Sequence, residues 1–417
     1  MKVVLLTGNP LCHNPRVLKE AEALAAAGHK VEVLGSGVSQ EYRERDAKLA
    51  QGKKWKFTGL LAGQSAYGKF MQRAKRFLGN EAHRLLGREN RWQLGPMAEA
   101  LLKEGRKRRA DLYIAHSEAG MWAAEQLRRE GHRVGVDLED WYSEDLLAEA
   151  RKGRPIQLLK TLEKDLLCHG SYSSCTSEAM ADALVKEYGC RRPTVIRNVF
   201  PIKDREGLDG KWKDRPGMAQ WMERNDPTAE RPKEAPVSIH WFSQTVGPGR
   251  GLEILFEALE GMEGNWELHL RGNLKGYEKW LEGVCPAQVR NKLTVHELVG
   301  NEELLSRIAE HDIGYAGELK EPPSRDLTIT NKVFQYLQGG LAVVASDTAG
   351  QKEATREADG GISLFSPERV EELRERLNEL LSDPKDLFSQ RKKAWAAGGK
   401  LNWEVESRRL LANISSA

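Results

Sequence analysis

The chain has 417 residues, of which 30% are charged, and its mean hydropathy is −0.58. This length is too great for one doubly wound sheet and natural for two, while the composition excludes a chain built mainly from membrane spans. A formal net charge of +3 is too weak to indicate a nucleic-acid-binding protein, so no nucleic-acid partner is expected.

The N-terminal residues predict a strand, a polar loop and a helix in direct succession. Residues 2–7 read KVVLLT, and Gly8 and Asn9 interrupt this apolar strand. Asn14, followed by a proline, is typical of a helix N-cap. A second apolar strand, VEVLG, completes a βαβ unit. Because the first loop reads GNPLCHNPR and lacks the GxGxxG pattern, this unit is not expected to bind a nicotinamide dinucleotide.

No targeting or membrane-spanning segment is expected. The N-terminus enters a strand directly, and the sequence has no run of eighteen apolar residues. We therefore expect a cytoplasmic protein.

Residues 40–109 are unusually basic and contain interspersed aromatic residues. Phe70, Phe77 and Leu78 share one face of a predicted helix that has basic neighbours on its flanks. Such a helix could lie on an anionic membrane surface, where each lysine or arginine contributes about 1 kcal/mol. The alternative is that the apolar face packs on the N-terminal sheet and the charges are merely solvated.

Polar residues follow the next two predicted strands. His116 comes directly after the strand DLYIA, at the carboxyl end where open α/β sheets place their ligands. The following strand, VGVDLED, ends in Asp137, Glu139 and Asp140. A lone histidine is more often structural, so the position of His116 at a strand end is what makes it a candidate for catalysis.

The composition divides the chain into two α/β domains. The first is expected to span residues 1–202 and to end after PTVIRNVFP. Residues 203–235 are polar and contain several prolines, so they predict a linker or insertion. Strands and helices alternate again over residues 236–399, and a last helix is expected over about 400–417.

Two segments of the second domain predict anion-binding helix starts. In SIHWFSQTVGPGRGLEILFEAL a strand meets a glycine-rich loop, and Arg250 and Gly251 precede an amphipathic helix. In LTITNKVFQYLQGGLAVVAS a helix opens on Thr330, Asn331 and Lys332. Free N–H groups and a partial charge of about half a unit attract phosphate to such a terminus.

These two segments resemble the paired donor-binding motifs of the group 1, or family 4, nucleotide-sugar glycosyltransferases. The resemblance spans nearly the whole chain and is most specific in residues 241–252 and 326–350. It implies an α/β fold of two Rossmann-like doubly wound domains that face each other across a cleft, known as GT-B. It also implies that the C-terminal helix packs back on the first domain.

The resemblance implies roles for individual residues. His116 would be catalytic and would face the donor sugar. The remaining expected site residues are Arg250, Gly251, Thr330, Asn331 and Lys332 on the donor diphosphate; Gln335, Gly272, Asn273, Glu297 and Leu298 on its ribose and base; and Gly8, Asn9, Asn14, Arg16 and Asp140 on the cleft side of the first domain.

One departure from the family pattern concerns a pair of glutamates eight residues apart. Gln335 replaces the glutamate that holds the donor ribose, and Leu327 stands where the other would be. An amide can still hydrogen-bond a ribose hydroxyl, without the charge assistance that roughly doubles such a bond. Members that open the helix with an asparagine-lysine pair commonly lack the first glutamate.

The resemblance implies transfer of a hexose-type unit from a nucleoside diphosphate sugar to an acceptor hydroxyl, with retention, in cell-surface polysaccharide or glycoconjugate synthesis. The acceptor would be a glycan or a lipid-linked molecule, met at the inner face of a membrane. No cofactor is expected. The DLED run resembles the metal-binding DxD of single-Rossmann glycosyltransferases, but two phosphate-binding helix starts make a metal unnecessary for neutralising the diphosphate.

Two alternatives share the same architecture. A nucleotide-sugar 2-epimerase would use the same diphosphate site and need no acceptor. A non-catalytic nucleotide-sugar-binding scaffold would explain the missing glutamates.

Overall fold

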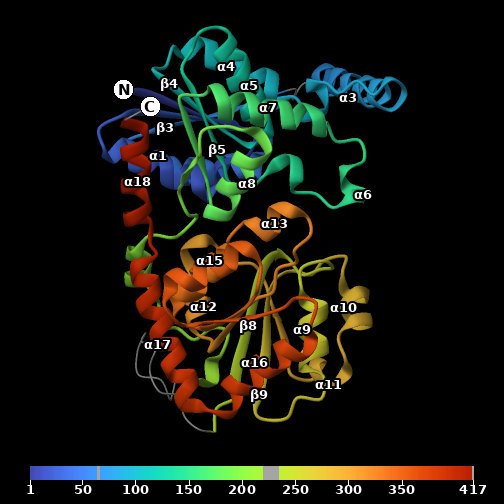
Figure 1. Ribbon diagram of the computed structural model, residues 1–417, viewed down its shortest axis with the longest axis vertical. Helices are drawn as coiled ribbons and strands as arrows, with labels where there is room; N and C mark the ends of the chain where they lie inside the picture. Colours follow the sequence, from blue (N-terminus) through green and yellow to red (C-terminus); the bar gives the residue numbers. More distant parts are fainter. Residues whose placement is uncertain (63–65, 219–233, 416–417) are drawn as a thin grey trace. The chain divides into compact units, whose positions relative to one another are not determined.

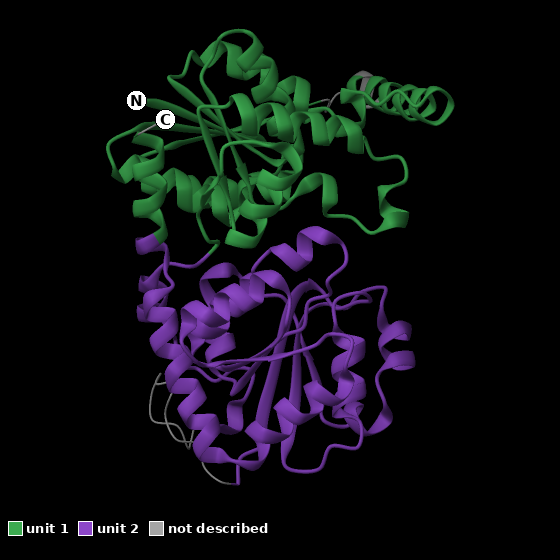
Figure 2. Cartoon of the chain, viewed as in Figure 1, with its two compact units in different colours: residues 1–198, 406–417 green, residues 199–405 purple. Residues whose placement is uncertain are grey.

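Apolar residues buried on both faces form parallel strands, and the computed structural model, which describes residues 1–62, 66–218 and 234–415, arranges them in two separate sheets (Figure 1). Unit 1 comprises Met1–Asn198 and Glu406–Ala417, and unit 2 comprises Val199–Val405 (Figure 2). The prediction of two doubly wound α/β domains is confirmed.

In the described part of unit 1 the sheet has seven strands in the order β3-β2-β1-β4-β5-β6-β7, all paired in parallel. The strands are β1 (Lys2–Thr7), β2 (Lys30–Ser36), β3 (Lys56–Leu60), β4 (Leu112–His116), β5 (Val134–Leu138), β6 (Tyr172–Cys175) and β7 (Thr194–Val195). The helices are α1 (Pro15–Ala26), α2 (Gln40–Ala50), α3 (Ala66–Leu86), α4 (Met97–Arg108), α5 (Ser117–Arg129), α6 (Ala148–Arg151), α7 (Ile156–His169) and α8 (Glu178–Tyr188), with short 3-10 turns η1 (Leu11–His13), η2 (Arg91–Leu94) and η3 (Tyr142–Glu144).

The described part of unit 2 has a six-stranded sheet in the order β10-β9-β8-β11-β12-β13. Its strands are β8 (Val237–Thr245), β9 (Trp266–Asn273), β10 (Leu293–His296), β11 (Ile313–Ala316), β12 (Ala342–Ser346) and β13 (Ile362–Phe365). Its helices are α9 (Leu252–Leu259), α10 (Glu278–Val284), α11 (Ala287–Arg290), α12 (Asn301–Ala309), α13 (Pro323–Leu327), α14 (Asn331–Gly339), α15 (Ala349–Ala358), α16 (Val370–Ser382) and α17 (Pro384–Lys400), with 3-10 turns η4 (Ile202–Gly207) and η5 (Pro216–Met218). A last helix, α18 (Trp403–Ser415), begins in unit 2 and continues into unit 1.

The strand orders locate a switch point in each sheet. The chain order reverses between β1 and β4 in unit 1, and between β8 and β11 in unit 2. Open α/β sheets bind ligands outside the carboxyl ends of the strands at such a point, because the loops on its two sides diverge. In unit 1, Thr7 pairs with His116, which brings the ends of β1 and β4 side by side.

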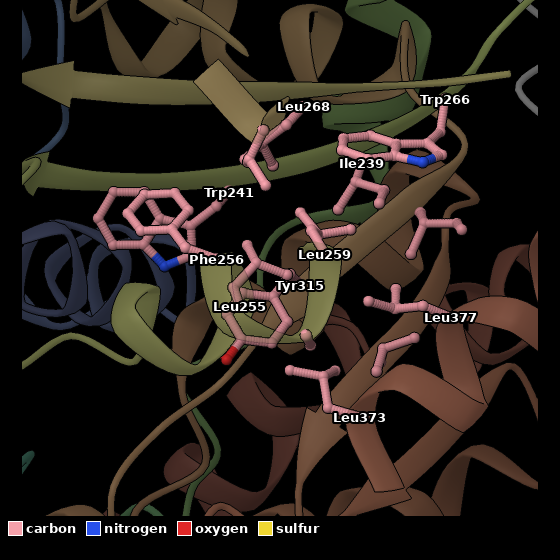
Figure 3. Packing of buried hydrophobic residues seen from close by; sticks show 14 of the residues in the cluster. Ile239, Trp241, Leu255, Phe256, Leu259, Trp266, Leu268, Tyr315, Leu373 and Leu377 are labelled. Carbon is pink, nitrogen blue, oxygen red and sulfur yellow. The ribbon is translucent and has the colours of Figure 1, made fainter. Parts of the chain in front are cut away.

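The core of unit 2 fixes helix α9 against the sheet. Figure 3 shows Trp241 and Tyr315 of the sheet packed with Leu255 and Phe256 of α9, and all four side chains are buried. Full burial of each large apolar side chain contributes roughly 1.5–3 kcal/mol. The position of the α9 N-terminus beside the switch point is therefore set by this packing.

Helix α3 does not pack its apolar face on the sheet. Phe70, Phe77 and Leu78 are 67%, 64% and 56% exposed, and Figure 1 shows the helix standing off from the sheet. The alternative in which these three residues belong to the core is therefore wrong. Amphipathic spacing indicates that a helix has an apolar face, but it does not identify what covers that face.

The segment expected to be a linker is partly integrated into unit 2. Within the described residues 203–218, Arg215 binds Glu267 at 2.6 Å and Asp312 at 3.4 Å. The Glu310 carboxylate accepts the backbone N–H groups of residues 213–215 at 2.7–3.1 Å. Residues 219–233 lie outside the described residues. The boundary between the units falls at 198/199, a few residues before the expected one.

The end of the chain returns to unit 1 along α18. Glu406 accepts the backbone N–H of Arg197 at 3.1 Å, and the Asn413 amide donates to the carbonyl of Ser173 at 3.4 Å. Among the described residues, no helix combines the length and apolarity needed to cross a bilayer.

Candidate active site

The loop between β8 and α9 is held tightly against the end of β11. Gly249 and Gly251 have φ values of 69° and 74°, the left-handed region that glycine adopts readily. A Cβ on residue 251 would collide with the carbonyl oxygen of Gly317, and the Tyr315 hydroxyl donates to the carbonyl of Gly251 at 2.7 Å. Glycine is therefore required where the two loops that flank the switch point touch.

Two helix N-termini open at this point. Among the described residues, no side chain caps α9, whose N-cap is Gly251, or α14, whose N-cap is Thr330. Thr330 instead interacts through its side chain with the carboxyl of Glu318 and helps to lower the pKa of that group. The N-cap residues thus leave the first-turn N–H groups of both helices available to an anion, and the contact of Gly251, Thr330 and Asn331 with a diphosphate stays a prediction.

Three cations accompany these N-termini. Arg250 donates to the Ser243 hydroxyl at 3.1 Å, and Arg325 donates to the carbonyl of Gly249 at 3.0 Å. Lys332 is nearly buried, lies 5.7 Å from the centre of the Trp241 ring and binds Glu318 at 2.6 Å. The two predicted cations are therefore joined by one that sequence reasoning missed, Arg325.

Glu318 also escaped sequence reasoning. Burial would raise the pKa of this carboxyl, but Lys332 and then Arg325 outweigh burial and lower the pKa. Glu318 is therefore an anion that orients Lys332. Glu253, in the first turn of α9, is a second carboxylate at this site and accepts the N–H of Gly249 at 3.1 Å. Three cations outnumber these two carboxylates, so the site keeps a net positive charge that suits a diphosphate. Glu318 lies just after β11, at the carboxyl edge of the sheet, and this position is the one sequence signal that could have identified it.

Most residues expected around the ribose and base lie at the ends of strands β9 and β10, which are on the side of β8 away from β11. Gly272 and Asn273 end β9, and Glu297 and Leu298 follow the adjacent strand β10. Gln335 lies one helical turn beyond Lys332, and its buried Oε1 has no hydrogen-bond partner among the described residues. An amide oxygen in that state is suited to accept a hydrogen bond from a ligand hydroxyl.

In unit 1, His116 lies inside a buried charge cluster at the switch point. Its Nε2 is 2.8 Å from Glu20 and its Nδ1 is 3.3 Å from Asp137, and the residue is only 1% exposed. Burial lowers the pKa of this imidazole, but Glu20 and Asp137 outweigh burial and raise the pKa to about 10. His116 is therefore a cation at neutral pH, able to donate a proton but not to accept one. Its contact with the donor sugar stays a prediction.

Two other predicted residues direct their side chains into unit 1. Arg16 is 2% exposed, binds both carboxylate oxygens of Asp137 at 2.5 and 2.7 Å, and donates to the carbonyl of Ile196 at 2.8 Å. Asn14 caps α1 by accepting the N–H of Val17 at 3.1 Å. Arg16 could reach a ligand only by breaking its pair with Asp137.

The same cluster contains residue types that bind metals. Glu20, His116 and Asp137 each place one ligand-type atom within 4.8 Å of the others. Arg16 already binds both oxygens of Asp137, and the imidazolium of His116 lies 2.8 Å from Glu20, so cations of the protein itself already neutralise these carboxylates. Sequence reasoning missed Glu20, although it follows Arg16 by one helical turn.

The remaining predicted residues of unit 1 line the ends of its strands. The N–H of Gly8 donates to the Ser117 hydroxyl at 2.8 Å, and the carbonyl of Asn9 accepts the N–H of Ser36 at 3.0 Å. Asp140 is half-buried just beyond β5. The structure thus gathers the predicted residues into two groups, one at the carboxyl edge of each sheet.

Comparison with known protein families agrees with this arrangement. Residues 13–198 match the glycosyl transferase 4-like domain, and residues 238–383 match the glycosyl transferases group 1 domain. No curated protein matches the chain by sequence.

Several solved structures share the fold. Sucrose-phosphate synthase from Thermosynechococcus elongatus matches with a TM-score of 0.69 at 15% identity, over 98% of this chain and 97% of that chain. Anabaena Alr3699/HepE in complex with UDP-glucose matches with a TM-score of 0.69 at 15% identity, over 100% of both chains. A UDP-forming trehalose-phosphate synthase from Burkholderia xenovorans matches with a TM-score of 0.65 at 12% identity, over 100% of this chain and 99% of that chain.

The two family matches follow each other along the chain, each containing one of the two sheets, and the fold is that of GT-B enzymes. The protein therefore belongs to the group 1 glycosyltransferases, with a glycosyl transferase 4-like domain followed by a group 1 domain.

Proposed function

We propose that the protein transfers a hexose from a uridine diphosphate sugar to an acceptor hydroxyl, with retention of the anomeric configuration. The observation that carries the proposal is the convergence of Arg250, Arg325 and Lys332 on two uncapped helix N-termini at the switch point of unit 2. Similar structures that hold UDP or UDP-glucose support uridine as the base.

The chemistry follows from the charge of the leaving group. The bond between the sugar C1 and the diphosphate oxygen breaks, a bond from C1 to the acceptor oxygen forms, and UDP and a proton are released. Negative charge grows on the diphosphate during this step. Fixed N–H groups and cations that already point at that charge stabilise the transition state without reorganisation. Arg250, Arg325 and Lys332 would supply this stabilisation, which is why we propose a metal-independent reaction.

Other residues would complete the donor site. Gln335 would hydrogen-bond the ribose, and the ends of β9 and β10 would hold the base, from Gly272 and Asn273 to Glu297 and Leu298. His116 would contact the transferred sugar as an imidazolium, and to do so it must turn one ring N–H away from Glu20 or Asp137.

The assay that tests the proposal combines a panel of UDP-sugars with candidate acceptors and measures both UDP and the sugar. A retaining transferase should release UDP only when an acceptor is present. The anomeric configuration of the sugar in the product should then be the same as in the donor. Conversion of the sugar without an acceptor would instead indicate an epimerase. Binding without turnover across the panel would contradict transfer.

We further propose that the enzyme meets its acceptor, a lipid-linked or surface glycan, while bound at the inner face of a membrane. Helix α3 supports this, because Phe70, Phe77, Leu78 and Leu85 are all exposed by more than half. The helix carries five lysines and arginines against one glutamate in its sequence. If α3 packed against α3 of a second copy of the chain, the positive charges of the two helices would repel each other. An anionic lipid surface is therefore the better complement.

Replacing both Phe70 and Phe77 by serine should reduce binding to anionic vesicles by about tenfold or more, because each inserted phenylalanine contributes roughly 1.5–3 kcal/mol. Co-sedimentation at low and high salt measures this, and binding should fall as salt screens the basic residues. Leu147→Ser, which removes an exposed leucine outside α3, is the matched control. Equal binding of the double variant and the control, or equal binding to neutral vesicles, would contradict the membrane proposal.

A further inference from the structure

A pocket of about 650 Å³ lies in unit 1 between α3, η2 and the start of α4. Its lining combines apolar surface from Met71, Trp92 and Pro96 with a strong excess of positive charge. The basic side chains that line it are Arg73, Lys75, Arg76, Arg91, Lys103 and Arg154, and Glu99 is the acidic one. No residue expected at the donor site contributes to it.

The positive charge of this pocket is only partly neutralised by the protein. Lys75 and Arg91 share Glu99 at 3.1 and 2.9 Å. Within the described residues, Arg73, Arg76 and Lys103 have no ion-pair partner. A concave site with several unpaired cations concentrates anions, and a phosphate group suits it because it carries about −1.5 to −2 charge and three acceptor oxygens.

Two buried donors in the lining also lack partners. The Trp92 Nε1 and the Arg154 Nε are both buried, and neither has a hydrogen-bond partner in the part of the chain that the structure describes. Buried N–H groups without partners are rare in native proteins, and a bound ligand is one way to satisfy them. The pocket therefore offers donors as well as charge.

The pocket and His116 lie at the same edge of the unit 1 sheet, the edge where the carboxyl ends of the strands meet. Helix α4 leads back to the amino end of β4, so its first turn lies at the carboxyl edge, where His116 ends that strand. Arg154 pairs with Glu118, the second residue of α5, and His116 is the N-cap of the same helix. A ligand in this pocket is thus bound on the side of unit 1 that carries the candidate catalytic residue.

We propose that this pocket is an acceptor subsite that binds a phosphate group on the acceptor. This inference rests on the proposed transfer function, and it narrows the acceptor to a phosphorylated molecule. The phosphate would contact Arg76 and Lys103, and Trp92 would pack on the adjoining sugar or apolar part. The same chemistry is offered by a soluble sugar phosphate and by the phosphate of a lipid headgroup.

The test compares two double variants that lose the same charge. Arg76→Ala with Lys103→Ala removes two pocket cations, and Arg88→Ala with Lys107→Ala removes two exposed cations outside the pocket. Calorimetry with glucose 6-phosphate, with glucose as the uncharged reference, tests the soluble source. Co-sedimentation with vesicles containing phosphatidic acid tests the lipid source.

Loss of affinity by about tenfold or more in the pocket variant, and not in the control, is expected for one of the two probes and identifies the source. Equal behaviour of the two variants toward both probes would overturn the subsite. UDP affinity is measured on the same samples and should be unchanged in both variants. If the wild-type protein failed to bind UDP, the proposed donor site would be contradicted. The proposed phosphate subsite would not be, because the two double variants are compared without nucleotide.

Discussion

Replacing Lys332 by alanine is expected to weaken UDP binding by about tenfold or more. A charge-assisted hydrogen bond to phosphate contributes about 1.5–3 kcal/mol, and this variant also leaves Glu318 without its lysine partner at the proposed diphosphate site. Arg250→Ala removes a cation without exposing a carboxylate, so its loss should be smaller than that of Lys332→Ala. Isothermal titration calorimetry with UDP gives both values.

The pairing of Lys332 with Glu318 supplies an internal check on this prediction. Adding Glu318→Gln to Lys332→Ala should recover part of the lost affinity, because the amide removes the repulsive charge. Lys352→Ala serves as the matched control, since this exposed lysine pairs with Asp347. Unchanged UDP affinity in both Arg250→Ala and Lys332→Ala would show that the diphosphate binds elsewhere.

Replacing His116 by alanine is expected to reduce the rate of transfer by about a hundredfold or more while leaving UDP affinity near that of the wild type. The imidazolium lies in unit 1, whereas the proposed diphosphate contacts lie in unit 2, so the loss should appear in kcat. Steady-state kinetics and UDP calorimetry on the same preparation separate the two effects.

Because His116 is buried between two carboxylates, its removal also leaves Glu20 and Asp137 without one of their cations. His116→Asn, whose neutral amide keeps an N–H donor group in place of the imidazolium, distinguishes a role in transfer from a role in folding. If the asparagine variant unfolds at the wild-type temperature and is still slow, the histidine acts on the reaction. Full activity in both variants would assign His116 a structural role only.

The features that the sequence predicts well are those encoded in adjacent residues. The strand, loop and helix of the first βαβ unit follow from the apolar run at residues 2–7 and from Asn14, which caps α1 as expected. The starts of α9 and α14 are likewise local, because Gly251 and Thr330 precede apolar residues at helical spacing.

The features that sequence analysis misses depend on contacts between distant residues. Glu318 and Arg325 reach Lys332 and Gly249 only after the sheet has placed β11 beside β8. Arg16 has the residue type of a ligand-binding side chain, yet Asp137, 121 positions away, binds it inside unit 1. No pattern along the chain encodes either pairing.

Hydrogen exchange of the backbone amides tests the central claim most directly, because it locates the bound diphosphate without altering the protein. On addition of UDP, we expect the amides in the first turns of α9 and α14, residues 252–254 and 331–333, to become the most strongly protected. Protection confined to unit 1, or UDP binding with no change at these two helix starts, would contradict the placement of the donor site.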